Sequence, residues 1–278
     1  MYLLVNKVKI LCQDVTYHVE IKGKGKPLLL LHGFTGDHST WDDVVNKLSQ
    51  QYMCIIPDIL GHGKSDSPKE FERYAMEKIV TDLQHILNYL DVSKVHLLGY
   101  SMGGRLALSF AVLCGNKVET LILESASPGI EAQSEREERK HQDTRLAERI
   151  LQDGMDNFVE YWGGIPLFAT QQSLPDNVKQ KITEQRLRNQ PVGLANSLLG
   201  MGTGVQPSWW NELPALNIPV LLLSGEYDQK FCKIARIMDE KLPNSEWKII
   251  NEVGHAIHVE DSEMFGRIVS EFLEKWRV

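Results

Sequence analysis

Residues 95–105, VHLLGYSMGGR, constrain the fold of this chain more than any other segment. An apolar run ends at Gly99, and Gly99 and Gly103 each lie two residues from Ser101. Such small neighbours let the backbone bend sharply between a strand and a helix, which exposes the serine hydroxyl. A short glycine pattern also arises by chance. The buried strand before it and the apolar helix pattern RLALSFAVL after it favour a catalytic serine turn over a chance one. The segment therefore predicts Ser101 as a nucleophile at a strand-to-helix turn.

The size and charge of the chain limit the classes of protein it can belong to. Its 278 residues, 42% of them hydrophobic, suffice for one large domain or for one domain with an insertion. The formal net charge of −7 argues against nucleic acid or an anionic membrane as the main partner. An anionic ligand would therefore need a local cluster of basic side chains. The oligomeric state is left open.

The cysteines and the first residues bear on location. The cysteines lack CxxC spacing and are expected to be reduced packing residues. They are Cys12, Cys54, Cys114 and Cys232. Lys7 and Lys9 interrupt the apolar residues of the N-terminus, so no secretion signal is expected, and no segment approaches membrane-spanning length. The prediction is a cytoplasmic protein without membrane insertion.

Strand and helix patterns alternate over the first 128 residues. Apolar runs predict strands at 3–12, 15–22, 26–31, 53–58, 95–99 and 120–123. Helical spacing predicts helices at 41–49, at 76–90 and from Met102 onward. This order predicts an α/β fold with a mostly parallel sheet of eight strands that is flanked by helices on both faces.

The alternation stops at about residue 129. From there to about residue 210 the patterns are helical, and the strand PVLLLSG at 219–225 resumes the sheet. One further helix and strand follow. We therefore expect a core formed by residues 1–128 and 211–278, and a helical lid, 129–210, inserted after the sixth strand. The lid would cover the carboxyl edge of the sheet, where ligands bind in open α/β sheets.

An acid and a histidine follow the last two predicted strands, in the chain order serine, acid, histidine. Asp228 ends the motif LLLSGEYD, and His255 ends KIINEVGH. In such a set the acid orients the imidazole, and the imidazole takes the serine proton. Glu226 is a rival acid because residues two apart in a strand point the same way, but Asp228 is preferred.

The other histidines are expected to have structural roles. His258 follows His255 by three residues, but two histidines without a third ligand nearby are weak evidence for a metal site. A lid or helix-start contact is the favoured role of His258. His32, His62 and His96 are expected to form structural hydrogen bonds or to lie at the surface. Neither a metal nor another cofactor is expected.

Two backbone N–H groups are candidates for holding negative charge. In folds with such a strand-to-helix turn at the serine, one donor is the N–H of the residue after the nucleophile. The other is an N–H of the loop after the third strand. Here these are Met102 and Phe34, which follows LLLLHG. The alternative is that residues 32–34 form only a strand-ending turn.

At this point the chain resembles the α/β-hydrolase superfamily over nearly its full length. The resemblance lies in five motifs in one order: LLLLHGFTG, PDILGHGKSD, GYSMGG, LLLSGEYD and EVGH. It implies the fold but says little about the reaction, because this fold carries esterases, C–C hydrolases, dehalogenases, lyases and receptors.

The lid resembles a narrower family, the 2-succinyl-6-hydroxy-2,4-cyclohexadiene-1-carboxylate synthases. The similar segments are GYSMGGR, SEREERKHQDTRLAERI, FVEYWGGIPLFA, EQRLRNQPVGLANSLLGMGTGVQPSWW and SGEYDQKF. The resemblance implies a lyase of menaquinone (vitamin K2) biosynthesis that eliminates pyruvate from 2-succinyl-5-enolpyruvyl-6-hydroxy-3-cyclohexene-1-carboxylate. It also implies substrate-binding residues, namely Arg105, Arg139, Arg186, Trp162 and Tyr100.

The arginines fit such a substrate, which carries three carboxylates. Guanidinium groups bind carboxylates through two hydrogen bonds and stay charged when desolvated. Arg105 lies in an otherwise apolar helix pattern and needs a buried partner or a ligand to offset desolvation. Alternatives remain open for the lid residues: Arg136, Arg145 or solvent exposure in place of Arg139, Arg188 in place of Arg186, and plain packing for Trp162.

The expected mechanism uses Ser101 as a general base rather than as a nucleophile. Asp228 and His255 would make Ser101 basic enough to take the proton from the ring carbon next to the succinyl ketone. Two other classes of protein remain alternatives. One is an esterase or C–C bond hydrolase that uses Ser101 as nucleophile, and the other is a small-molecule receptor with almost no catalytic turnover.

Overall fold

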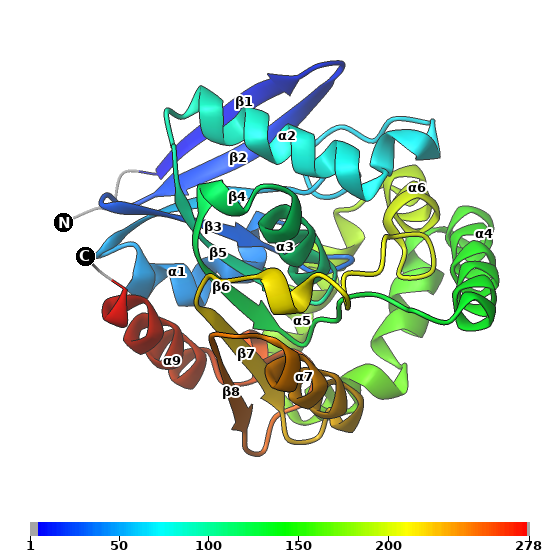
Figure 1. Cartoon of the computed structure of the whole chain (residues 1–278). Helices are drawn as coiled ribbons and strands as arrows, with labels where there is room; N and C mark the ends of the chain where they lie inside the picture. Colours follow the sequence, from blue (N-terminus) through cyan, green and yellow to red (C-terminus); the bar gives the residue numbers. More distant parts are fainter. Residues whose placement is uncertain (1–4, 277–278) are drawn as a thin grey trace.

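A computed structural model describes residues 5–276 (Figure 1). Eight strands form one sheet in the order β1-β2-β4-β3-β5-β6-β7-β8. The first three of this order, β1 (Val5–Cys12), β2 (Val15–Lys22) and β4 (Tyr52–Pro57), pair antiparallel. The remaining neighbours pair parallel; the strands are β3 (Lys26–Leu31), β5 (Val95–Tyr100), β6 (Val118–Glu124), β7 (Val220–Gly225) and β8 (Ser245–Ile250).

Helices cover both faces of this sheet (Figure 1). Helices α1 (Asp42–Leu48) and α9 (Ser262–Lys275) share one apolar core with one face, and α2 (Met76–Tyr89), α3 (Met102–Leu113) and α7 (Gln229–Lys241) share another core with the opposite face. In β3, Leu28 and Leu30 belong to the first core, and Leu29 and Leu31 to the second. A strand buried on both faces is apolar at every position, which is why LLLL predicted it.

The predicted α/β fold with its eight-stranded, mostly parallel sheet is confirmed, with small shifts at the ends of elements. Residues 3–4 of the first predicted strand lie outside the described residues. The strand predicted at 120–123 extends to Val118–Glu124. Its apolar run stops at Leu123, but Glu124 continues the ladder opposite Tyr100 and Leu223.

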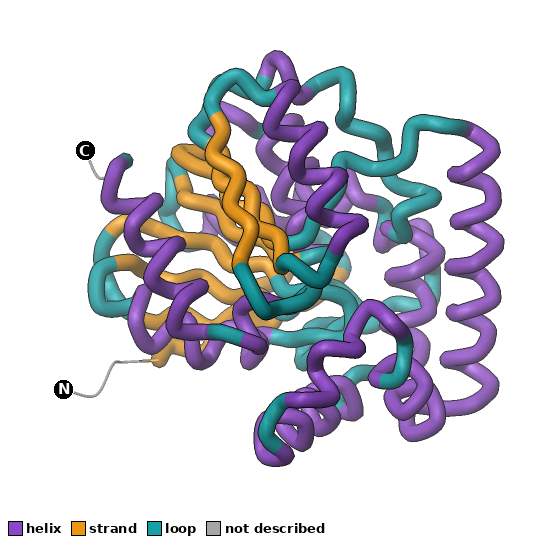
Figure 2. The backbone as a smooth tube through the Cα atoms, turned by 90° about the horizontal axis from the view of Figure 1, so that it is seen from below, coloured by secondary structure: helices purple, strands orange, loops and turns teal. Residues whose placement is uncertain are grey.

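The helical lid predicted after the sixth strand is also confirmed. It contains α4 (Gln133–Gly163), a 3-10 segment (Pro166–Ser173), α5 (Asp176–Leu187) and α6 (Pro191–Met201), and residues 129–210 contain no strand. Helices α4 and α6 pack side by side at one end of the sheet, and Figure 2 shows this end from below. Gly154, with φ +74°, breaks α4. The exact boundaries at residues 129 and 210 stay predictions. Trp209 and Trp210, which the prediction assigns to the lid, pack in the core that includes α3.

Cys12, Cys54, Cys114 and Cys232 are all buried and free of disulfides. Within residues 5–276, no helix is both long enough and apolar enough to cross a membrane.

Candidate active site

Ser101 lies at a sharp turn between β5 and α3. Its backbone has φ +50° and ψ −106°, a conformation that side-chain-bearing residues rarely adopt. The neighbouring glycines make this turn possible. A Cβ atom on Gly103 would lie 2.1 Å from the Leu31 carbonyl oxygen, and one on Gly99 would lie 2.3 Å from the Gly103 carbonyl oxygen. The strand-to-helix turn predicted from the sequence is therefore present, and only glycine fits beside it.

The structure brings Ser101, His255 and Asp228 together. His255 Nε2 lies 3.0 Å from Ser101 Oγ, and His255 Nδ1 lies 2.5 Å from Asp228 Oδ2. His255 is 2% exposed and Asp228 is 7% exposed, so the contact is shielded from water. Because an ionised carboxylate only accepts hydrogen bonds, Nδ1 carries the proton and Nε2 is left to accept the Ser101 proton. This is the geometry that activates a serine.

Glu226, the rival acid, is directed elsewhere. Its carboxylate accepts the backbone N–H of Glu252 at 2.9 Å. Asp228 instead begins α7, where its Oδ1 accepts the Phe231 N–H at 3.4 Å while Oδ2 faces His255. The strand ends at Gly225, so the two-residue period that made the two acids equivalent no longer applies at Asp228.

Phe34 and Met102 both line the cavity into which Ser101 opens. Met102 is the first residue of α3, so its N–H has no acceptor within the helix. Phe34 follows β3, and its N–H donates no hydrogen bond to any other described residue. Two free N–H donors at one cavity suit an oxyanion, and the oxyanion role of Phe34 and Met102 stays a prediction.

The Ser101 cavity has a volume of about 230 Å³ and lies between the sheet and the lid. Aromatic and aliphatic side chains form much of its wall. Its charged lining residues are Arg105, Arg139 and Lys230, and no aspartate or glutamate of the described chain lines it. Such a cavity favours a small organic ligand with several negative charges.

Arg105 has no carboxylate partner among the described residues. Its Nη1 donates to the Met201 carbonyl oxygen at 2.8 Å and to the Gln206 side chain. Burial, and after it the charge of Arg139, lower the pKa of Arg105 to about 10. Arg139 is paired with Asp143 at 2.8 Å. A half-buried guanidinium that has only neutral acceptors is poised to bind an anion.

The rivals of Arg139 lie away from the Ser101 cavity. Arg136 donates to the backbone carbonyls of residues 205 and 206, and Arg145 is exposed. Arg188, the rival of Arg186, forms an ion pair with Asp37 at 2.8 Å. Of the arginines considered in the charged run of the lid, Arg139 is the one that reaches the cavity.

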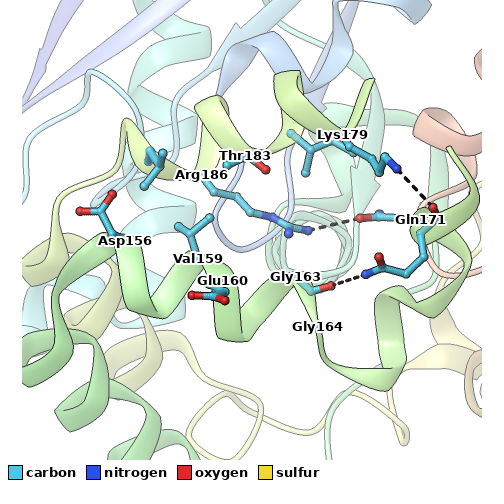
Figure 3. A pocket seen from close by; sticks show the side chains of 12 residues that line it. Asp156, Val159, Glu160, Gly163, Gly164, Gln171, Lys179, Thr183 and Arg186 are labelled. Atoms are coloured by element: carbon cyan, nitrogen blue, oxygen red, sulfur yellow. Dashed lines mark hydrogen bonds between the residues drawn. The ribbon is translucent and has the colours of Figure 1, made fainter. Parts of the chain in front are cut away.

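Arg186 does not line the Ser101 cavity. Its guanidinium lies 4.8 Å from the centroid of the Phe168 ring, and its Nη2 donates to Gln171 at 3.4 Å. It faces a second pocket, of about 460 Å³, between α4, the 3-10 segment and α5, and Figure 3 shows it directed toward Gln171 there. Phe168 contacts both Arg186 and His255, whose ring lies 6.1 Å from the Phe168 ring. The assignment of Arg186 as a substrate ligand therefore stays a prediction.

Trp162 and Tyr100 both line the Ser101 cavity. The Trp162 ring packs against Phe34 and Phe168, while its buried Nε1 has no hydrogen-bond partner among the described residues. Tyr100 contacts the His255 ring at 5.4 Å, and burial raises the pKa of Tyr100 well above its usual value. Trp162 thus has the packing role left open for it, and its unpartnered Nε1 lies in a residue of the cavity wall.

Several polar residues of the cavity, among them Lys230 and Ser125, were not predicted from the sequence. Lys230 lies on the first turn of α7, two residues after Asp228, and Ser125 follows β6 with an unpartnered hydroxyl. Their positions in the sequence could have indicated them. Ser125 directly follows the carboxyl end of β6, and Lys230 follows Asp228, the acid after β7; ligands bind at these ends of parallel strands.

Four other histidines, His32, His62, His96 and His258, are buried and hydrogen-bonded. His258, at the start of α8 (Ile257–Glu260), contacts the Glu124 carboxylate at 2.8 Å. His32 binds the Gly33 carbonyl oxygen through Nδ1 and accepts the backbone N–H of residue 59. Burial lowers the pKa of His62 to about 3 and that of His96 to about 4. These are structural roles, as the sequence predicts.

One group has the spacing of metal ligands, outside the Ser101 cavity. Candidate ligand atoms of His18, His38 and Asp58 all lie within 4.8 Å of one another. Both ring nitrogens of His38 already face carboxylates, Nδ1 at 2.8 Å from Asp58 and Nε2 at 3.2 Å from Glu20. Hydrogen bonding within the group therefore accounts for the arrangement of His38.

Comparison with known proteins places the chain in a family. A family model for the alpha/beta hydrolase fold matches residues 26–262. A Bacillus subtilis (strain 168) protein with the provisional name 2-succinyl-6-hydroxy-2,4-cyclohexadiene-1-carboxylate synthase is 46% identical over 93% of this chain and 95% of its own length. The protein of that name from Photorhabdus laumondii is 30% identical over 88% of this chain and 84% of its own length.

Solved structures agree with these relatives. The structure of MenH from S. aureus is 38% identical with a TM-score of 0.88, and the match covers 91% of this chain and 95% of that one. A thermophilic esterase from Thermogutta terrifontis is 29% identical with a TM-score of 0.87, over 98% and 100% of the two chains. The chain therefore belongs to the α/β-hydrolase superfamily and, within it, to the family of 2-succinyl-6-hydroxy-2,4-cyclohexadiene-1-carboxylate synthases.

Proposed function

We propose that this chain is a cytoplasmic lyase of menaquinone biosynthesis. It eliminates pyruvate from 2-succinyl-5-enolpyruvyl-6-hydroxy-3-cyclohexene-1-carboxylate to give 2-succinyl-6-hydroxy-2,4-cyclohexadiene-1-carboxylate. The names of its relatives support this reaction. The observation that carries it is the charge of the Ser101 cavity, in which Arg105, Arg139 and Lys230 gather without an acidic lining residue. A substrate with three carboxylates matches that charge.

Ser101, His255 and Asp228 act as a proton-transfer triad in this proposal. His255 accepts the Ser101 proton, and the Ser101 oxygen takes the proton from the ring carbon next to the succinyl ketone. The resulting enolate is held by the N–H groups of Phe34 and Met102. Its electrons then form the second ring double bond and break the C–O bond to enolpyruvate, which receives the proton from His255 and becomes pyruvate. General-base catalysis of this kind contributes roughly 10²–10⁴-fold to the rate.

The carboxylates of the substrate are assigned to the basic groups around the cavity. Arg105 and Arg139 are within the cavity, and Trp162 and Tyr100 form its aromatic wall. Arg186 is the third guanidinium of the proposal, and it lines the neighbouring pocket rather than the Ser101 cavity. Lys230 already lines the cavity and supplies a third positive charge there without any movement.

The test is release of pyruvate by the purified full-length chain from the enolpyruvyl substrate. Wild type should release pyruvate, and Ser101→Ala should reduce the rate by roughly 10²-fold or more because the base is lost. Absence of pyruvate from the wild type would overturn the lyase assignment. A covalent adduct between Ser101 and this substrate, trapped during turnover, would overturn the base mechanism while leaving the reaction intact.

Hydrolysis of an ester, or of a C–C bond next to a ketone, is the second candidate. It is favoured by the structural similarity to the esterase from Thermogutta terrifontis and by the intact contact between Ser101 and His255. In that case Ser101 attacks the carbonyl carbon and an acyl-enzyme forms. Rapid turnover of uncharged esters, combined with no pyruvate release, would select this candidate. A receptor role predicts neither activity.

A further inference from the structure

Glu124 and His258 form a buried polar pair next to the candidate active site. The Glu124 side chain is fully buried at the carboxyl end of β6, and His258 is buried at the start of α8. His258 Nδ1 lies 2.8 and 2.9 Å from the two carboxylate oxygens, and the His258 backbone N–H donates to Oε1 at 3.1 Å. Two donors of one residue thus satisfy a carboxylate that is out of contact with water.

Glu124 also holds the turn that carries Ser101. Its backbone carbonyl oxygen accepts the Ser101 N–H at 2.9 Å, and Glu124 lies opposite Tyr100 in the ladder between β5 and β6. Because the positive φ of Ser101 is an unfavourable conformation, it persists only where surrounding bonds fix it. Glu124 is therefore bonded to the Ser101 turn through its backbone and to His258 through its side chain.

His258 is in turn coupled to His255. The two histidines are three residues apart, and the Tyr100 ring contacts both, at centroid distances of 5.4 Å to His255 and 4.5 Å to His258. The Trp41 ring packs on His258 at 4.8 Å. In a close-packed interior these contacts leave His258 little room to move. The segment that presents His255 is thereby anchored to the same residue that anchors Ser101.

We propose that Glu124 and His258 are positioning residues that set the 3.0 Å distance between Ser101 Oγ and His255 Nε2. Neither residue lines the Ser101 cavity. The inference rests on the proposed roles of Ser101 and His255, but not on the identity of the substrate. A displacement of about 1 Å in a reacting pair lowers a rate by roughly 10²-fold, so a loose anchor has a measurable effect.

The test measures the rate at which a fluorophosphonate labels Ser101 in the full-length protein, per folded molecule. In this reaction the Ser101 oxygen bonds to phosphorus, fluoride leaves and His255 takes the proton, so the natural substrate is not needed. Glu124→Leu and His258→Ala should be labelled about 10- to 100-fold more slowly than the wild type. Glu124→Gln keeps an acceptor and His258→Asn keeps a donor, so both should recover most of the rate.

His96→Ala is the matched control, because His96 is also a buried imidazole, and it lies in β5 with a bond to Thr120 at 2.9 Å. It should lower Tm yet leave the labelling rate per folded molecule within about 2-fold of wild type. Equal labelling rates in wild type, Glu124→Leu and His258→Ala would overturn the positioning role alone. Failure of the wild type to react at Ser101 would overturn the proposed triad and this inference with it. If Glu124→Leu does not fold, His258→Ala and His258→Asn decide.

Discussion

At the scale of single residues, Arg105 distinguishes this site from that of a simple esterase. Removing a guanidinium from water is unfavourable unless a partner or ligand compensates. In the described chain, the acceptors of Arg105 are a backbone carbonyl and the neutral Gln206 side chain, while the charge of Arg139 opposes its own. A carboxylate of the substrate would relieve both costs. The selectivity of the site for anionic substrates is therefore expected to depend on Arg105.

Arg105→Ala should lower kcat/KM for pyruvate release by about 10- to 100-fold, because a hydrogen bond to a charged group contributes about 1.5–3 kcal/mol. Hydrolysis of a small uncharged ester, if the chain supports it, should change little. Arg149→Ala is the control, since Arg149 is half-buried, does not line the Ser101 cavity and is paired with Asp153 within α4. Equal losses with the anionic and the uncharged substrate would contradict a role in carboxylate binding and indicate a disturbed pocket instead.

At the scale of elements, the turn between β5 and α3 depends on how closely α3 approaches the end of β3. Gly103 lies where a Cβ atom would be 2.1 Å from the Leu31 carbonyl oxygen, an unyielding backbone atom. The same approach places Met102 and Phe34 at one cavity. Phe34 follows Gly33 in the loop after β3. Close contact between helix and strand is thus a condition for the pair of oxyanion donors.

Gly103→Ala should therefore destabilise the fold by at least about 2 kcal/mol, the usual range for overpacking a core, and lower Tm by about 5 °C or more. Thermal unfolding followed by circular dichroism measures this change. Gly115→Ala is the control, because a Cβ atom there meets nothing within 4 Å and Gly115 also lies near an end of α3. A Tm for Gly103→Ala equal to that of the control would show that the contact relaxes easily.

At the scale of the whole molecule, the sequence predicts the features that depend on local patterns. It does not predict those that depend on long-range packing. The strands follow from apolar runs such as Leu28–Leu31, and the Ser101 turn follows from its glycines. The place of Arg186 does not, because it depends on how Phe168 of the 3-10 segment packs against α5. The contact between Glu124 and His258 joins residues 134 positions apart, and neither local sequence indicates it.

The lid is also joined to the core by an ion pair between a buried aspartate and an exposed arginine. Asp37, in the loop after β3, is 1% exposed and bonds to Arg188 just after α5 at 2.8 Å. Burial alone would raise the pKa of Asp37, but hydrogen bonds from Ser39, Gln185 and Arg188 outweigh it and lower the pKa to about 2. The ordinary pKa of an aspartate is about 3.9, so the ionised form stabilises the folded state by about 2 kcal/mol at neutral pH.

Because the folded-state pKa of Asp37 lies below the unfolded value, this stabilisation is present above about pH 4 and is lost as the pH falls toward 2. Asp37→Asn should lower the free energy of unfolding at pH 7 by about 2 kcal/mol, measured by urea denaturation, and should flatten the decline in stability between pH 4 and pH 2. Asp176→Asn is the control, since Asp176 is an exposed residue of α5 paired with Lys179. An acid decline as steep in Asp37→Asn as in wild type would show that other carboxyl groups cause it, and that the pair with Arg188 does little to fasten the lid to the core.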